Sequence, residues 1–254
     1  MNGVDGAKFS HIIVDEGQDV SPLHYATLRA YSANGSATVV GDVHQGLVAF
    51  RGVESWNEAE RAFAPSAFTR HRITTSYRST KQITELGNAI LEQLDSPEGL
   101  AEPFPRDGVT PELITCAARD HIAVLVQQIT RLRNAGHQNI GIVCRTTVEA
   151  QALHTEMSLT LKPSPGMALS RDASYHGGEL ILPLSLAKGL EFEAVILANG
   201  SRAAFGNTAE DLRLLYVAIS RALHRLVIVS PGQIPLGLAA ALGGPLTTGS
   251  ASLP

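Results

Sequence analysis

The stretch that decides the fold is His11-Ile12-Ile13-Val14-Asp15-Glu16-Gly17-Gln18-Asp19-Val20-Ser21-Pro22. Its short apolar run, ending in acids, predicts a buried strand over 11–15. A helix should follow to about Ala33, because Ser21 suits the N-cap and Pro22 the first helical position. The run 36–40 predicts a second strand, which ends at Gly41-Asp42. Two strands that each end in an acidic loop, with a helix between them, form half of an α/β nucleotide-binding lobe, and the other half would lie upstream.

Further along the chain the same alternation continues. Helices are expected over 54–64, 81–94, 120–134, 147–161 and 210–222, and strands over 73–76, 112–116, 139–144, 179–184, 194–199 and 225–230. Residues 95–110 are rich in proline, glycine and acids and are expected to form a loop. The pattern predicts an α/β fold with a mostly parallel sheet covered on both faces. We expect a partial first lobe over 1–68, a complete second lobe over 69–230, and a flexible, uncharged tail over 231–254.

The composition is that of a soluble globular protein. Of the 254 residues, 44% are hydrophobic and 17% are charged, which allows a sizeable core. The apolar runs are too short to span a bilayer, the N-terminus has no signal-peptide pattern, and a cytoplasmic location is expected. Cys116 and Cys144 are the only cysteines and are expected to be core thiols. The net charge of −4 gives no overall attraction to nucleic acid, so any basic groove must be local.

The two strand-end loops of the first lobe carry candidate catalytic groups. Asp15 and Glu16 stand where open parallel sheets bind ligands. Magnesium takes one or two carboxylates together with phosphates and waters. Asp15 is therefore the expected metal ligand, and Glu16 the group that would orient and deprotonate an attacking water. Gln45, after the second strand, could hydrogen-bond a terminal phosphate. Each short motif alone is also explained by a polar turn, so the prediction depends on their order.

Five segments occur in a fixed order: Val14-Asp15-Glu16-Gly17-Gln18-Asp19, Gly41-Asp42-Val43-His44-Gln45, Ser76-Tyr77-Arg78-Ser79, Lys188-Gly189-Leu190-Glu191-Phe192, and Leu215-Tyr216-Val217-Ala218-Ile219-Ser220-Arg221-Ala222. This set resembles the superfamily 1 DNA helicases of the UvrD/Rep type. The resemblance implies RecA-like lobes, ATP and Mg²⁺ as cofactors, and single-stranded or duplex DNA as a partner. It also implies ATP-driven movement along nucleic acid, with the nucleotide bound between two lobes.

The resemblance assigns roles in the second lobe. Tyr77 would stack on adenine, and Arg78 would reach the terminal phosphate. Gly189 would allow a tight turn, with Lys188 supporting the loop or approaching phosphate. Glu191 would accept hydrogen bonds from the ribose hydroxyls. Arg221 matches the arginine finger, and Arg213 would lie on the same helical face, at a spacing of fours through Val217. For Arg213, a surface salt bridge is the alternative.

A DNA contact is implied after the second loop, where relatives carry I-Y-x-[WF]-R-G. Here Phe50 and Arg51 match that pattern, but Val48 stands where a tyrosine is usual. A stacked base contributes roughly 1–3 kcal/mol, so DNA contact at this position should be weaker. Core packing is the alternative explanation for Phe50.

Two features refine the resemblance. The form Pro183-Leu184-Ser185-Leu186-Ala187-Lys188-Gly189-Leu190-Glu191-Phe192 and the short interval before it resemble the HelD, or helicase IV-like, branch. The phosphate-cradling loop G-x-x-x-x-G-K-[ST] does not occur in these 254 residues. We therefore expect the C-terminal part of a motor that lacks ATPase activity by itself and needs the missing N-terminal lobe. The alternative is a non-catalytic module that binds nucleic acid or RNA polymerase.

Overall fold

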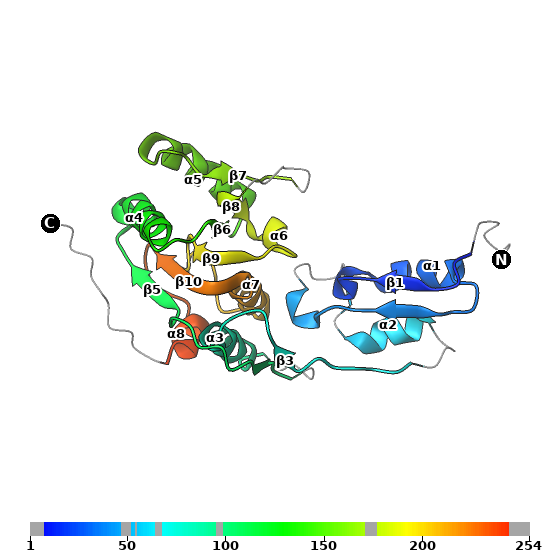
Figure 1. The fold of residues 1–254 in the computed structure, drawn as a ribbon. Helices are drawn as coiled ribbons and strands as arrows, with labels where there is room; N and C mark the ends of the chain where they lie inside the picture. The colour runs from blue at the N-terminus through cyan, green and yellow to red at the C-terminus, as the bar shows by residue number, and fades with distance from the viewer. Residues whose placement is uncertain are drawn as a thin grey trace. The chain divides into compact units, whose positions relative to one another are not determined.

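The computed structural model describes residues 8–46, 52–53, 55–63, 68–94, 99–170 and 177–243. Figure 1 shows the chain, which divides into two compact units, Met1–Ile73 and Thr74–Pro254. The predicted DNA-contact residues Phe50 and Arg51 lie outside the described residues, as does Val48.

The first unit contains a two-stranded parallel sheet with helices after each strand. Its elements, in chain order, are β1 (Ile12–Val14), the 3₁₀ turn η1 (Gly17–Asp19), α1 (Pro22–Tyr31), β2 (Ala37–Val39), the 3₁₀ turn η2 (Val43–Gln45) and α2 (Trp56–Phe63). The start of α1 is as predicted, because the Ser21 side chain accepts a hydrogen bond from the His24 backbone N–H and Pro22 occupies the first turn. The predicted strand–loop–helix–strand order is therefore confirmed.

The core of this unit gathers around Tyr25, which is fully buried. The Tyr25 hydroxyl donates a 2.6 Å hydrogen bond to the Gly17 carbonyl, and burial raises the pKa of Tyr25 to about 12. The Phe63 ring meets the Tyr25 ring edge-on at a centroid distance of 6.0 Å. Trp56 packs against the same cluster and lies close to the loops that follow both strands. The side chains that form the core thus also support these loops.

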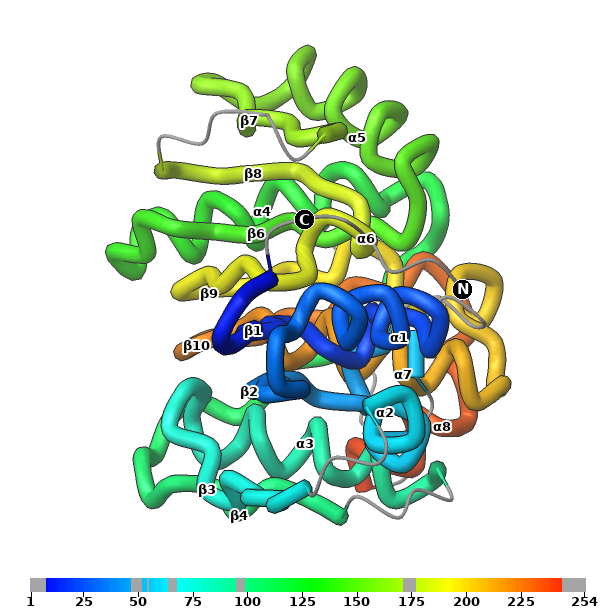
Figure 2. The backbone as a smooth tube through the Cα atoms, turned by 90° about the vertical axis from the view of Figure 1, so that its right-hand side faces the viewer, coloured from blue at the N-terminus to red at the C-terminus, as the bar shows by residue number. Residues whose placement is uncertain are grey.

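The second unit is built on a six-stranded sheet in which every neighbouring pair is parallel. The strand order is β5-β10-β9-β6-β8-β7, and Figure 2 shows β7, β8, β6, β9 and β10 following one another across it. The strands are β5 (Glu112–Thr115), β10 (Ala222–Ser230), β9 (Phe192–Leu197), β6 (Asn139–Cys144), β8 (Gly178–Pro183) and β7 (Gly166–Met167). A separate two-stranded parallel ribbon pairs β3 (Thr75–Ser76) with β4 (Glu102–Pro103).

Helices cover both faces of this sheet, as the sequence predicts. On one face, α4 (His121–Asn134) and α5 (Thr147–Thr160) bury apolar side chains against alternate residues of the central strands, such as Ile140, Ile142 and Cys144 of β6. On the other, α3 (Lys81–Leu91) and α7 (Ala209–Ile219) pack together over β10, and α8 (Leu236–Ala241) packs on α3. The short helix α6 (Leu184–Ala187) begins the return from β8 to β9. Figure 1 shows these layers.

The structure corrects the predicted boundaries in several places. The predicted loop over 95–110 contains β4, and neither β7 nor α6 was predicted. The helix expected over 210–222 ends at Ile219, and β10 already begins at Ala222. The flexible tail expected over 231–254 is wrong for α8, because Leu238 is fully buried and Gln93 donates a hydrogen bond to the Gly237 carbonyl. The absence of charged residues suggested disorder, but apolar packing against α3 orders α8.

Cys144 is a core thiol as predicted, whereas Cys116 is only partly buried and packs against the same core cluster. Both cysteines are free; Cys144 is fully buried in β6, and burial raises the pKa of its thiol. Across the described ranges, the helices are too short or too polar to cross a bilayer.

Candidate functional site

Two loops of the first unit meet at the carboxyl edge of its sheet. Asp15 and Glu16 directly follow β1. Gly41 and Asp42 follow β2 after one intervening residue, Val40. Because β1 and β2 are parallel neighbours, both loops leave the sheet at the same edge. The Gly17 backbone N–H donates a 2.8 Å hydrogen bond to the Val40 carbonyl, which joins the loops directly.

Glu16 adopts a left-handed conformation, with φ 52° and ψ 41°. Among the described residues it is the only non-glycine with a positive φ. Its backbone N–H donates to Asp15 Oδ1 at 2.8 Å, and its Oε2 accepts from Gln18 Nε2 at 2.5 Å. Backbone strain of this kind is concentrated at functional sites, where the surrounding structure holds it in place. The predicted catalytic glutamate therefore has both a fixed backbone and a hydrogen-bonded carboxylate.

The second loop is organised by Asp42. One oxygen of its carboxylate accepts the His44 backbone N–H at 2.9 Å and so caps η2. The other accepts from Gln45 Nε2, also at 2.9 Å. The Asp42 backbone N–H in turn donates to Gln18 Oε1 at 3.0 Å. Gln18 thus connects the loop of Glu16 with the loop of Gln45, and three predicted site residues, Asp15, Glu16 and Gln45, lie in one hydrogen-bonded region.

The donor set at this edge suits a hard cation held by few protein ligands. Asp15 is exposed, and one of its oxygens accepts the Glu16 N–H. Within the ranges that the structure describes, no three His, Cys, Asp or Glu side chains gather into a metal-binding cluster. Magnesium at nucleotide sites is typically bound by one or two carboxylates, with phosphates and waters completing the shell. Asp15 fits that pattern.

In the second unit, three segments far apart in the sequence converge at the amino edge of the sheet. Arg78 Nε lies 2.8 Å from Glu191 Oε1, which joins the segment before α3 to the segment before β9. The Ser79 hydroxyl donates to the Ala222 carbonyl at 2.6 Å, and the Thr80 N–H donates to the Leu223 carbonyl at 3.1 Å. These bonds fasten the tyrosine–arginine segment to the start of β10, beside Arg221.

Lys188 and Gly189 form the predicted tight turn. Lys188 has φ −61° and ψ 132°, Gly189 has φ +79°, and the Leu190 N–H donates to the Ala187 carbonyl at 3.0 Å. These are the features of a type II turn, whose third position requires a positive φ. The turn places Glu191 directly before β9, where it meets Arg78.

Arg221 is buried, with only 1% of its surface exposed. Its Nε donates to the Val217 carbonyl at 3.1 Å, its Nη1 to the Leu190 carbonyl at 3.4 Å, and its Nη2 to the Ser220 hydroxyl at 3.0 Å. In this structure the guanidinium therefore ties the end of α7 to the loop that carries Glu191.

The predicted common face of Arg213, Val217 and Arg221 is wrong, since α7 ends at Ile219 and Arg221 lies beyond it. Arg213 is exposed on α7, whereas Val217 is fully buried. The serine and arginine that follow the helix turn the chain into β10, so a spacing of fours does not continue through them.

Tyr77 has a partner that the sequence did not reveal. The Tyr77 side chain is 64% exposed, and its ring lies 4.9 Å from the Phe104 ring between centroids. Arg106 donates to the backbone carbonyls of both Tyr77 and Arg78. These contacts depend on the pairing of β3 with β4, whose two-residue strands leave no periodic signal in the sequence.

A second group missed by sequence reasoning lies at the opposite, carboxyl edge of the large sheet. Arg145, just after β6, forms a 2.9 Å ion pair with Asp211 in the first turn of α7, and its guanidinium lies 5.0 Å from the centre of the Phe205 ring. Asp211 also forms a capping box with Thr208. Burial tends to raise the pKa of Asp211, but hydrogen bonds from Thr208, the Arg145 charge and the Gly206 N–H outweigh it, so the pKa lies below its usual value.

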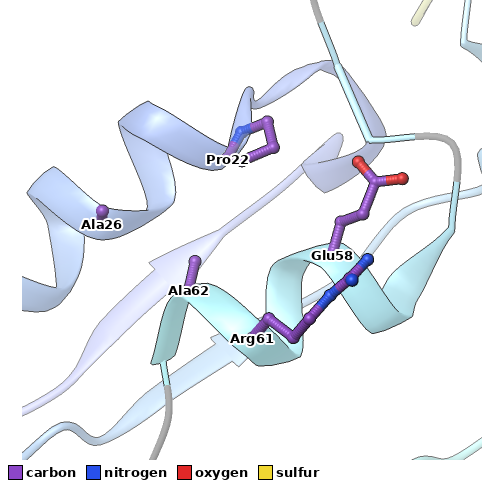
Figure 3. A pocket seen from close by; sticks show the side chains of 5 residues that line it. All are labelled: Pro22, Ala26, Glu58, Arg61 and Ala62. Atoms are coloured by element: carbon purple, nitrogen blue, oxygen red, sulfur yellow. The ribbon is translucent and has the colours of Figure 1, made fainter.

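A pocket of about 400 Å³ lies between α1 and α2 of the first unit. It is lined by Pro22, Ala26, Glu58, Arg61 and Ala62 (Figure 3), none of which is a predicted site residue. The strand-end loops and this pocket are therefore separate features.

Two family models match separate parts of this chain. Residues 6–61 match the UvrD/REP helicase N-terminal domain, and residues 181–229 match the UvrD-like helicase C-terminal domain. DNA helicase II of Salmonella typhimurium is 34% identical over 155 residues, which is 58% of this chain and 21% of that protein. A probable DNA helicase of Mycoplasma pneumoniae is 23% identical over 244 residues, which is 87% of this chain and 43% of that protein.

A solved structure agrees with the fold. The C-terminal domain of a possible DNA helicase from Lactobacillus plantarum has a TM-score of 0.54 and 26% identity, covering 66% of this chain and 94% of that one. The six-stranded parallel sheet with helices on both faces thus has the fold of a helicase RecA-like domain. This chain spans less than half of the length of each curated relative named above. Together these findings support a relationship to UvrD/Rep-type superfamily 1 helicases.

Proposed function

We propose that this chain is the C-terminal part of an ATP-dependent superfamily 1 DNA helicase or translocase. The observation that carries the proposal is the grouping of the motif residues within each unit. Asp15, Glu16 and Gln45 gather at one edge of the first sheet, in the segment matching the N-terminal helicase domain. Arg78 and Glu191 pair in the second unit, beside the segment that leads into β10.

The residues divide the work of hydrolysis. Bound Mg²⁺·ATP supplies the phosphoanhydride whose cleavage releases the free energy for movement. Asp15 would hold the metal, Glu16 would take the proton of the attacking water, and Gln45 would hydrogen-bond the terminal phosphate. Tyr77 presents a largely exposed ring suited to stacking on adenine. Glu191 would accept the ribose hydroxyls, with Lys188 and Gly189 shaping its loop.

The two arginines need different changes to act on a phosphate. The Arg78 side chain is 45% exposed and its pair with Glu191 is partly solvated, so exchange of partners costs little. Arg221 would have to leave its carbonyl partners, Val217 and Leu190, before it could meet a phosphate oxygen. A rearrangement of the segment around Leu190 is therefore part of the proposed cycle, and exposed Arg213 is a second source of positive charge.

We place the protein nearest the compact, HelD-like branch of these helicases. About 100 residues separate the tyrosine–arginine segment from the lysine–glycine turn. The described part of that interval supplies α3, α4, α5 and four strands of the large sheet. The described residues of this interval thus belong to the second unit itself. This supports a helicase branch that has no large inserted domain between the two motifs.

The first test concerns ATP hydrolysis. The 254 residues contain no phosphate-cradling loop, so the chain alone should show only background ATPase activity. If the DNA upstream of the Met1 codon encodes such a loop in frame, the longer protein should hydrolyse ATP in response to DNA. Glu16→Gln and Arg221→Ala should then each reduce turnover, the arginine change by about 10³-fold or more. Arg202→Ala, an exposed position elsewhere in the second unit, is the matched control. DNA-stimulated turnover that survives Glu16→Gln would refute the proposal.

A second candidate function is a non-catalytic module that binds nucleic acid or RNA polymerase. The observation that favours it is the inward-facing Arg221, whose guanidinium donates to the carbonyls of Val217 and Leu190 and so helps hold the second unit together. Retention of single-stranded DNA or of purified RNA polymerase by the 254-residue chain should then be unchanged in Glu16→Gln and Arg78→Ala. Loss of that binding in either variant would favour the catalytic proposal.

A further inference from the structure

Gln18 carries an inference beyond the roles given above. We propose that Gln18 is a positioning residue that couples the carboxylate of Glu16 to the loop that carries Gln45. The inference rests on the proposed function, since it concerns regulation of the same site. Gln18 is polar but only 1% exposed, and it lies between two loops whose other polar residues are more accessible.

Both ends of the Gln18 amide are used, and they point to different loops. Nε2 donates to Glu16 Oε2 at 2.5 Å, and Oε1 accepts from the Asp42 backbone N–H at 3.0 Å. The chemistry of the partners fixes this orientation, because a backbone N–H can only donate and an ionised carboxylate can only accept. Glutamine offers one acceptor and one donor at the required reach. Glutamate would place two carboxylates together, and methionine would satisfy neither partner.

The connection continues to Gln45. The Asp42 residue that donates its N–H to Gln18 accepts the Gln45 side-chain amide through its carboxylate, at 2.9 Å. A chain of hydrogen bonds therefore runs from Glu16 through Gln18 and Asp42 to Gln45. Its ends are the proposed base for water and the proposed contact of the terminal phosphate.

Close packing leaves Gln18 little freedom to move independently. A methyl group added at Gly41 would lie 2.1 Å from Gln18 Oε1, and one added at Gly52 would lie 1.8 Å from the Gln18 carbonyl oxygen. The Val53 N–H donates to that same carbonyl at 3.0 Å. Backbone from the Gly41–Asp42 loop and from one further segment, 52–53, thus holds Gln18 in place, so a displacement of the Asp42 loop must either move Gln18 or break its bonds.

This arrangement makes the position of Glu16 depend on the state of the Gln45 loop. When Gln45 turns from Asp42 towards a phosphate, the change is passed through Asp42 and Gln18 to the Glu16 carboxylate. Gain and loss of the terminal phosphate would then place and release the base, which couples the nucleotide state to hydrolysis competence.

The test uses the 254-residue chain and needs no nucleotide. The NMR signals of the Asp42 backbone amide and the Gln45 side-chain amide are recorded in the wild type, Gln18→Met and Gln18→Glu backgrounds, each with and without Glu16→Ala. Glu16→Ala should shift both signals in the wild type and leave them unmoved in Gln18→Met, which bonds neither loop. In Gln18→Glu the shift should differ from that of the wild type, because Glu16→Ala then removes a repulsion between two carboxylates instead of a hydrogen bond. Shifts in Gln18→Met as large as those in the wild type would overturn the proposal. Glu58→Ala on α2 is the control for changes that spread through the unit without this connection.

Amide hydrogen exchange separates the two ends of Gln18. Gln18→Glu keeps an acceptor for the Asp42 N–H and should retain its protection, whereas Gln18→Met should lower it roughly tenfold. Equal protection in the two variants would show that Gln18 does not hold the Asp42 loop and would overturn the proposal. If Gln18→Met does not fold, Gln18→Leu, which also offers neither a donor nor an acceptor, takes its place in both experiments. Because these signals are read without ATP, a failed coupling and a failed ATPase test are distinguishable.

Discussion

Gly189 shows how one backbone angle can make a residue type necessary. Its φ of +79° is reached easily by glycine, while other residues pay about 1–2 kcal/mol for the left-handed region. No neighbouring atom lies within 4 Å of the position that a Cβ would take. The necessity at this position therefore comes from the backbone alone and not from lack of space.

Replacing Gly189 by alanine should destabilise the protein by about 1–2 kcal/mol, measured as the free energy of unfolding in urea. Gly189→Asn should cost less, because asparagine tolerates this region better. Lys188→Ala is the matched control, since its φ of −61° suits any residue. Equal stability of the alanine and wild-type proteins would contradict the assignment of the turn.

Asp211 predicts a pH dependence of stability. Its pKa in the folded protein lies below the ordinary value of about 3.9, so its ionised form stabilises the fold at any pH above that value. The stabilisation should be lost as the pH falls below about 4 and through the lowered pKa. Urea unfolding at a series of pH values should show wild type exceeding Asp211→Asn near neutrality, with the difference shrinking in acid. Parallel curves for the two proteins would exclude this role of Asp211.

At the scale of elements, α5 begins with a side-chain cap. Thr146 accepts the Glu149 backbone N–H at 3.1 Å, and the helix starts at Thr147. Thr146→Ala should reduce the free energy of unfolding by about 0.5–2 kcal/mol. Thr155→Ala removes a threonine from the exposed interior of the same helix and should change stability by less than about 0.5 kcal/mol. An equal loss in both variants would mean that capping is not what Thr146 contributes.

The longer elements could be predicted from the sequence, whereas several short ones could not; the three-residue strands β1 and β2 were predicted because acidic loops and a capped helix flank them. β6 was predicted with its observed bounds because six residues between turn signals are enough to identify a buried strand. The four residues of α6 and the two of β7 are too few to show a period. α8 was missed for a different reason: its alanine- and leucine-rich sequence carries no polar face, and the contact with α3 that orders it is distant in the chain.

At the scale of the whole molecule, the two units should differ in local stability. The sheet of the first unit has two strands, and Ile13 within it is 74% exposed. In the second unit β6 has a strand on either side, and Ile140 and Ile142 are fully buried. A two-stranded sheet alone is marginal, so hydrogen exchange under mild denaturant should release the amides of β1 and β2 before those of β6 and β9. Simultaneous release would show that the units unfold as one.

The candidate site was predictable to the extent that its motifs are local. Three of the motifs can each be recognised from a few consecutive residues: the strand-end acids, the glycine turn and the tyrosine–arginine segment. The pairing of Arg78 with Glu191 and the burial of Arg221 depend on where α3, β9 and β10 meet, and no short segment encodes that meeting. Gln18 was visible in the motif, but its two partners became known only from the arrangement of both loops.

Trp56, described above as part of the first core, is the only tryptophan of the chain. A methyl group added at Gly41 would lie 3.0 Å from its ring and one at Gly17 3.3 Å, so the indole borders both strand-end loops. Indole fluorescence is sensitive to nearby polarity and quenching groups. Light selectively absorbed by tryptophan therefore excites a single chromophore beside Gly17 and Gly41. The protein thus has a built-in optical reporter of these loops, and it requires no label.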